Sequence, residues 1–164
     1  MKDQDILPLP SNNSNNDAIW NKVIVQLQDY TKLRKWKTYF YFDTEDISYP
    51  EKKTIILNKR HRPEILCYYF LHEIGHLIMV FDDKEDYKAK YKPLEEHSTN
   101  SQIYRVLTVE LEICAWNEGL KLAKSLNIPV NQTKFNELKA SSLATYMVWA
   151  MSRKMQLKKQ IKDS

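Results

Sequence analysis

Glycine is unusually scarce in this chain. Its 164 residues include only two glycines, Gly75 and Gly119, where average usage of about 7% would give roughly eleven. A phosphate-binding loop needs two glycines five positions apart, a dinucleotide-binding turn needs three within six residues, and a nucleophile elbow needs two flanking a serine. Two glycines this far apart exclude all three motifs.

Cysteine is also scarce, and the net charge is small. Cys67 and Cys114 are the two cysteines, and both lie in apolar stretches without the short spacing of a redox pair or a thiolate metal site. We predict that both are reduced core residues. The formal net charge is +4, and much of the excess follows Met151, where we expect a solvated helix end. This charge is too small to indicate nucleic acid as a partner.

Long apolar runs are missing as well. Residues 1–10 lack the apolar segment of a secretion signal, so we expect a cytoplasmic protein. The longest apolar stretch runs from Ile65 to Phe81 and is interrupted by His72, Glu73 and His76. It is short for a bilayer span. We therefore predict a buried helix and no membrane partner.

The hydrophobic patterns predict an α+β fold with a single domain over residues 17–160, after a disordered tail at 1–16. A small antiparallel sheet is expected to pack on the helix that contains His72, with further long helices around it. The expected strands cover 38–42, 47–49 and 54–57, and the expected helices cover 17–33, 63–80, 101–126 and 133–159. Residues 81–100 are polar and contain Pro93, so we predict a long loop there, which either closes over a cleft as a lid or is a solvated connection.

The motif His72-Glu-Ile-Gly-His76 lies in the middle of the apolar helix. Residues four apart face the same side of a helix, so both imidazoles can bind one ion, and Glu73 lies one step away, beside a bound water. Zinc lowers the pKa of its water to about 7 and polarises a carbonyl, while a nearby glutamate accepts the water's proton. We predict that His72 and His76 bind Zn²⁺ and that Glu73 is the catalytic base.

A catalytic zinc site needs a third protein ligand and an open position. The candidates are a histidine of the long loop and three glutamates of the next helix: His97, Glu110, Glu112 and Glu118. Around Glu112, the positions three, four and seven residues away include Thr108, Ala115 and Gly119, which are all small. Such a stripe lets two helices approach closely, which favours Glu112, while Glu110 remains an alternative.

Several of these segments resemble the ImmA/IrrE-type zincin metallopeptidases. The resemblance is carried by Ile55–Asn58, Glu64, Phe70–Ile78 and Glu112–Ala115, and it extends over about residues 38–126. It implies a zincin-like fold for the domain at 17–160, with His72, His76 and Glu112 as zinc ligands and Glu73 as the base. The sequence departs from the family where Trp116 replaces the asparagine that usually follows the alanine, and no helix-turn-helix module is attached.

The resemblance implies a zinc-dependent metallo-endopeptidase that cleaves an intracellular protein such as a repressor or regulator. The alternative is a zinc-containing protein-binding module that does not hydrolyse its partner. Residues 54–57 are either the strand that receives the substrate or an internal strand. Candidate donors to the oxyanion are His97, Tyr104 and Tyr146. Finally, Gly75 and Gly119 are expected where the two ligand-bearing helices come close.

Overall fold

The computed structural model describes residues 14–82 and 84–162, and the side chains of 16–82 and 84–152. Within these ranges the chain forms five α-helices and three strands, in the order α1 (Ser14–Leu33), β1 (Lys37–Tyr41), β2 (Ile47–Tyr49), a 3-10 turn η1 (Pro50–Lys52), β3 (Thr54–Asn58), α2 (Pro63–Phe81), α3 (Lys84–Glu96), α4 (Gln102–Ser125) and α5 (Gln132–Lys162). The predicted α+β class is confirmed at this level.

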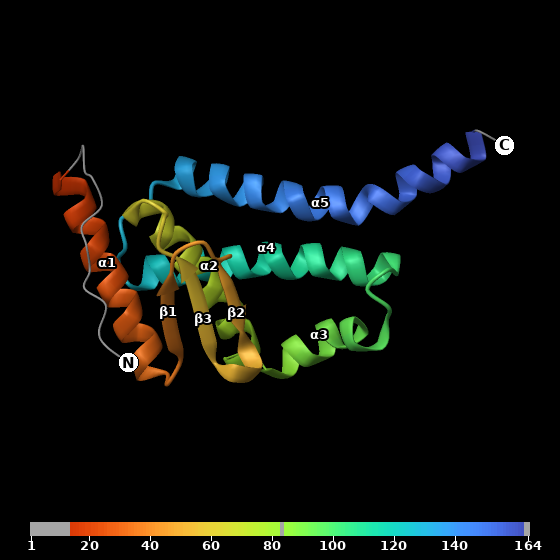
Figure 1. Cartoon of the computed structure of the whole chain (residues 1–164). Helices are drawn as coiled ribbons and strands as arrows, with labels where there is room; N and C mark the ends of the chain where they lie inside the picture. The colour runs from red at the N-terminus through yellow and green to blue at the C-terminus, as the bar shows by residue number, and fades with distance from the viewer. Residues whose placement is uncertain (1–13, 83, 163–164) are drawn as a thin grey trace.

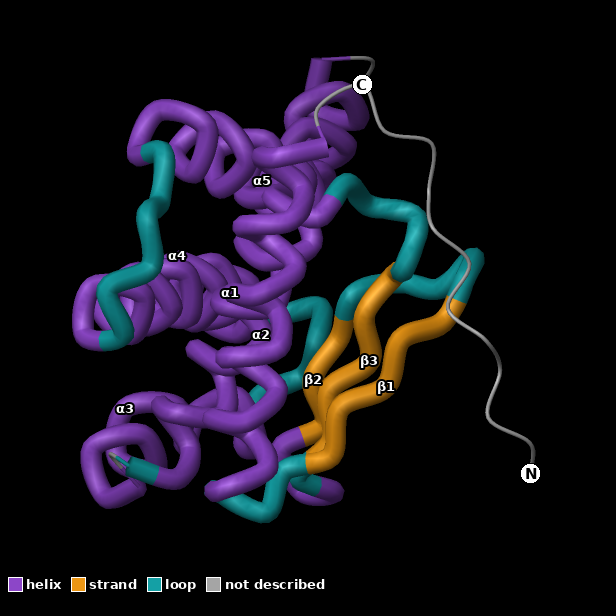
Figure 2. Tube along the Cα trace, turned by 90° about the vertical axis from the view of Figure 1, so that its left-hand side faces the viewer, coloured by secondary structure: helices purple, strands orange, loops and turns teal. Residues whose placement is uncertain are grey.

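Helix α2 is the centre of the molecule. The sheet lies on one side of the structure and the helices on the other (Figure 2), and α2 contacts the sheet, α1, α3 and α4. Helix α5 runs alongside α4 (Figure 1). Among the described residues, α2 alone is long and apolar enough to cross a membrane, and most of it is buried inside the protein. Neighbours on several sides therefore account for its apolar composition.

The sheet is mixed, so the predicted antiparallel sheet is wrong for one of its two pairings. The strand order is β1-β3-β2, with β3 parallel to β1 and antiparallel to β2. Strand β2 does not form a hairpin with β1. Instead η1 and Lys53, whose φ is 50°, return the chain so that β3 fits between the other two strands. Alternating hydrophobicity identifies strands but does not encode which strand becomes the neighbour.

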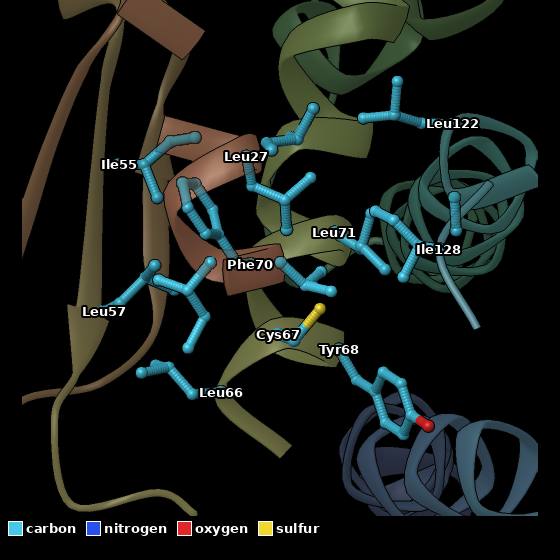
Figure 3. Close-up of a cluster of buried hydrophobic side chains, with 14 of the residues drawn as sticks. Leu27, Ile55, Leu57, Leu66, Cys67, Tyr68, Phe70, Leu71, Leu122 and Ile128 are labelled. Atoms are coloured by element: carbon cyan, nitrogen blue, oxygen red, sulfur yellow. The ribbon is translucent and has the colours of Figure 1, made fainter. Parts of the chain in front are cut away.

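The main core lies between the sheet and α2. The side chains of Ile55 and Leu57 on β3 point toward Phe70 and Leu71 on α2, with Leu27 of α1 beside them (Figure 3). All five are fully buried. Each such side chain contributes about 1.5–3 kcal/mol relative to an exposed one, so this contact fixes α2 against the sheet.

The segment expected to be a long loop contains helix α3, so that prediction is wrong. Tyr87, Tyr91 and Leu94 recur at helical spacing and pack in a second apolar cluster with Met79 and Ala115. This burial stabilises the helix although Pro93 lies inside it. Pro93 hides the periodicity in the sequence because proline usually ends a helix.

Helix α1 begins earlier than expected. It starts at Ser14, so Asp17 lies in its first turn and not at its cap, and residues 1–13 of the expected tail are outside the described part. Trp20, Val23, Ile24 and Leu27 form its buried face. Ile19 and Leu33 also fit the helical spacing of this face but are 51% and 85% exposed.

Helix α5 contributes less to the core than its pattern suggests. Phe135 is 1% exposed, whereas Met147 and Met151, which also fit the apolar pattern of the helix, are 52% and 56% exposed. The backbone N–H of Lys134 donates to the side chain of Asn131, so Asn131 caps the start of the helix. The start of α5 is therefore anchored in the core through Phe135, and further along the helix the backbone carbonyl of Trp149 accepts a hydrogen bond from Arg105 of α4.

Candidate metal centre

His72, His76 and Glu112 form a compact group of potential metal ligands. The two histidines lie one turn apart on α2, and Glu112 faces them from α4. His72 Nε2 is 3.3 Å from Glu112 Oε2, and His76 Nε2 is 3.6 Å from Glu112 Oε1. One ligand atom from each residue lies within 4.8 Å of the other two. These are the residues that the sequence predicted as the ligand set.

The two glycines explain how α2 and α4 come this close. A Cβ atom added to Gly75 would overlap the backbone carbonyl of Ala115, and one added to Gly119 would overlap the carbonyl of Leu71. The backbones of α2 and α4 therefore touch. The contact lies three residues after His72 on α2 and seven residues after Glu112 on α4. The prediction that both glycines lie at a close helix approach is confirmed.

The group is buried, and its charges stabilise one another. His72 and Glu112 are 5% and 7% exposed. Burial alone raises the pKa of Glu112, but the two histidine rings beside its carboxylate outweigh this effect and lower that pKa to about 2. Burial lowers the pKa of His76, while the nearby carboxylates of Glu112 and Glu73 outweigh this effect and raise that pKa overall. Glu112 is therefore ionised at neutral pH, as a metal ligand must be.

Two buried atoms of this group have no hydrogen-bond partner: His72 Nδ1 and Glu112 Oε2. An unpaired buried polar atom is costly and calls for an explanation. Two imidazole nitrogens and a carboxylate are also a common donor set for catalytic zinc, which leaves a fourth position open. A metal ion bound by Glu112 Oε2 would satisfy one of the two unpaired atoms.

Glu73 lies beside the ligand group. It is 4% exposed, and its Oε1 is 3.7 Å from His72 Nε2. A cleft of about 390 Å³ opens over Glu73 and the three candidate ligands. The predicted base and the predicted ligands thus line one cavity that is open to solvent.

The other candidate ligands lie elsewhere. Glu110 Oε1 is 2.8 Å from the ammonium of Lys90, and Glu118 Oε1 is 2.6 Å from that of Lys121. His97 is exposed between α3 and α4. None of the three belongs to the group of ligand atoms found among the described residues.

Of the three candidate oxyanion donors, Tyr146 lines the cleft. Burial raises the pKa of its hydroxyl, and the negative charges of Glu112 and Glu73 raise it further. The hydroxyl therefore keeps its proton at neutral pH and can donate it in a hydrogen bond. Tyr104 lines a separate hollow between α4 and α5, and His97 does not line the cleft.

Strand β2 lies at the cleft and at one edge of the sheet. Ile47 and Ser48 of β2 line the cleft, whereas residues 54–58 form the central strand β3. Of the two roles weighed for residues 54–57, the structure therefore supports the internal strand. The strand at 47–49 was predicted, but its place at the edge of the sheet was not, because its three residues carry no signal of their position in the sheet.

The turn before β2 is held by a small polar network that the sequence did not reveal. Asp46 accepts a hydrogen bond of 2.8 Å from the backbone N–H of Asn58, and its other oxygen is 2.7 Å from His61 Nε2. The ring of His61 packs on Tyr69 with centroids 4.7 Å apart. These contacts tie the cleft-lining turn to the segment that leads into α2.

No protein-family model, curated protein or solved structure matches this chain. The resemblance to ImmA/IrrE-type metallopeptidases thus stays a prediction based on the motifs described above, and the function rests on the geometry of the cleft.

Proposed function

We propose that the protein is a zinc-dependent metallo-endopeptidase. The observation that carries this proposal is the convergence of His72, His76 and Glu112 at the floor of a cleft, with the buried carboxyl of Glu73 beside them. In this proposal the first three residues hold Zn²⁺. A bound zinc supplies a Lewis acid and lowers the pKa of a water molecule.

The residues of the chain have separate roles in the proposed reaction. Glu73 accepts the proton of the attacking water and passes it to the leaving amine. The Tyr146 hydroxyl, which is protonated at neutral pH, donates a hydrogen bond to the carbonyl oxygen as negative charge develops there. Its position in the cleft and its raised pKa support this role.

Strand β2 offers a place for the substrate backbone. As an edge strand that lines the cleft, it can pair with an extended peptide through main-chain hydrogen bonds, which give affinity independent of sequence. This position supports a polypeptide substrate more than a small molecule. By the resemblance of the motifs, we propose that the target is an intracellular repressor or regulator.

The test compares wild type with Glu73→Gln. The substitution removes the base but keeps a side chain of the same size, so we expect unchanged zinc content and loss of cleavage. The measurement is the set of new protein termini in cells expressing each form, with zinc determined on the purified proteins. Glu96→Gln, at an exposed carboxyl on α3, is the matched control and should cleave like wild type.

Two results would change the proposal. Cleavage by Glu73→Gln at the wild-type rate would remove the mechanism. Zinc binding without any new termini in the wild type would favour the alternative, a zinc-containing module that binds a protein without hydrolysing it.

A further inference from the structure

A second hollow lies next to the cleft, between α4 and α5. Its volume is about 440 Å³, and six residues line it: Thr99, Tyr104, Thr108, Thr145, Tyr146 and Trp149. We call it the α4/α5 hollow. Tyr146 lines both this hollow and the cleft, so one tyrosine forms the boundary between the two cavities.

The hollow is uncharged and mainly apolar. None of its six lining residues carries a charge at neutral pH, and three of them are aromatic. Thr108 Oγ1 donates to the carbonyl of Tyr104, and Thr145 Oγ1 donates to the carbonyl of Ser142. Two of the three threonine hydroxyl protons are therefore used within their own helices and are not offered to a ligand.

Arg105 on α4 places a positive charge close to Trp149. Arg105 is 8% exposed, its Nη1 donates to the backbone carbonyl of Trp149 at 3.0 Å, and its guanidinium lies 5.2 Å from the centre of the Trp149 ring. This contact fixes α5 against α4 and holds the indole in place. Arg105 itself is not among the residues that line the hollow.

The hollow is within reach of a peptide bound in the cleft. Thr108 precedes Glu112 by four residues, which is one turn and about 6 Å along α4. The start of the hollow is therefore within about the length of one long side chain from Glu112. A peptide side chain close to the bond at the metal centre, directed away from β2, would enter between α4 and α5.

From these observations we infer that the α4/α5 hollow binds a large uncharged side chain, aromatic or long aliphatic, of the polypeptide that enters the cleft. The role of the hollow as a specificity pocket rests on the proposed peptidase function. Binding of the side chain in the hollow does not depend on that function. Burying an ionised Lys, Asp or Glu side chain there is unfavourable because the walls offer no partner charge.

A binding experiment tests the hollow without any cleavage. The zinc-loaded full-length chain is titrated with N-acetylphenylalanine amide, N-acetyllysine amide and N-acetylaspartic acid amide, while the indole N–H resonance of Trp149 is followed. The resonance is assigned by its loss in Trp149→Phe. We expect the phenylalanine derivative to shift it at concentrations at least tenfold lower than the other two.

Variants of the lining residues test whether the probe binds in the hollow. Thr108→Phe fills the hollow from α4, and Thr145→Leu narrows it from an exposed position on α5, so each should weaken binding about tenfold or more. Ala144→Phe adds a side chain at the exposed position next to Thr145 and should leave binding unchanged. Equal binding of the three probes, or binding unaffected by both hollow variants, would overturn the inference.

A cleavage profile then separates this inference from the proposed function. We expect the wild-type enzyme to cut a proteome-derived peptide library where Phe, Tyr, Leu or Met lies within three residues of the bond, and Thr108→Phe to shift that preference toward Ala or Gly. Cleavage with no such preference would overturn the specificity role and leave the peptidase intact. Probe binding without any cleavage would overturn the peptidase and support the hollow as a binding site.

Discussion

The indole of Trp116 stacks on the imidazole of His72, with ring centroids 4.4 Å apart and planes 18° from parallel. Trp116 is fully buried, and Phe135 of α5 packs edge-on against it with centroids 5.2 Å apart. The candidate ligand His72 is therefore held in orientation by an aromatic contact that continues into α5. This indole occupies the position at which the sequence departs from the family it resembles.

Replacing Trp116 should weaken zinc binding as well as the fold. Trp116→Ala leaves a cavity beside His72, so we expect a loss of about 3–5 kcal/mol in unfolding free energy and weaker zinc affinity. Trp116→Phe keeps a stacking ring and should retain most of the unfolding free energy and most of the zinc affinity. Trp36→Phe, at a buried tryptophan that packs on Tyr30 and Phe81, is the control. Denaturant unfolding and competition with a zinc chelator measure the two quantities. Unchanged zinc affinity in a folded Trp116→Ala variant would contradict an orienting role.

Removing the Glu112 carboxylate should abolish stable zinc binding. Outer-shell partners of a metal already contribute about 10–100-fold in affinity, so loss of a ligand in Glu112→Gln should cost more than about 100-fold. Glu110→Gln is the matched control, because Glu110 pairs with Lys90 on the neighbouring helix and should leave zinc content unchanged. Metal analysis after dialysis distinguishes them, and the reverse pattern would assign the ligand to Glu110.

Alanine at either glycine should destabilise the protein, although glycine to alanine inside a helix normally stabilises by about 1 kcal/mol. The added Cβ would overlap a backbone carbonyl of the facing helix. Overpacking of this kind typically costs about 1–3 kcal/mol. We expect Gly75→Ala and Gly119→Ala to lower the melting temperature and the zinc affinity together. Ser141→Ala, at an exposed position of α5, should do neither; a Gly75→Ala protein with a raised melting temperature would contradict the close approach.

The two cysteines should differ sharply in reactivity. Cys67 is fully buried, and burial together with the charge of Glu64 raises the pKa of its thiol to about 12, whereas Cys114 is partly exposed. Iodoacetamide at pH 8 should label Cys114 in the folded protein and both cysteines after unfolding. Mass spectrometry of the labelled peptides gives the result, and rapid labelling of Cys67 in the folded chain would contradict it.

The same pKa shift predicts a pH dependence of stability. In the unfolded chain the thiol ionises near its ordinary pKa of about 8.5, so the neutral folded thiol contributes stability below that pH. The contribution is lost as the pH rises toward 12, by up to about 1.4 kcal/mol per pH unit. Unfolding free energies of wild type and Cys67→Ala at pH 8 and pH 10.5 test this. Cys67→Ala should be less stable at pH 8 but should lose less on going to pH 10.5; equal losses would contradict the shift.

The sequence predicted the elements and the ligand group better than it predicted their arrangement. His72, His76 and Glu112 could be found because helical spacing and a stripe of small residues are local signals. The parallel pairing of β1 with β3 could not, since pairing direction depends on contacts between distant segments. Helix α3 was hidden because Pro93 masked the spacing of Tyr87, Tyr91 and Leu94.

The contact between α2 and α4 also sets the spacing of the candidate metal ligands. Because main-chain atoms at Gly75 and Gly119 touch the opposite helix, neither helix can slide or rotate without a steric clash. The distances between His72, His76 and Glu112 are thus set when the two helices pack, before any ion arrives. Zinc would enter a preorganised frame, so its loss would empty the site without loosening the helices around it.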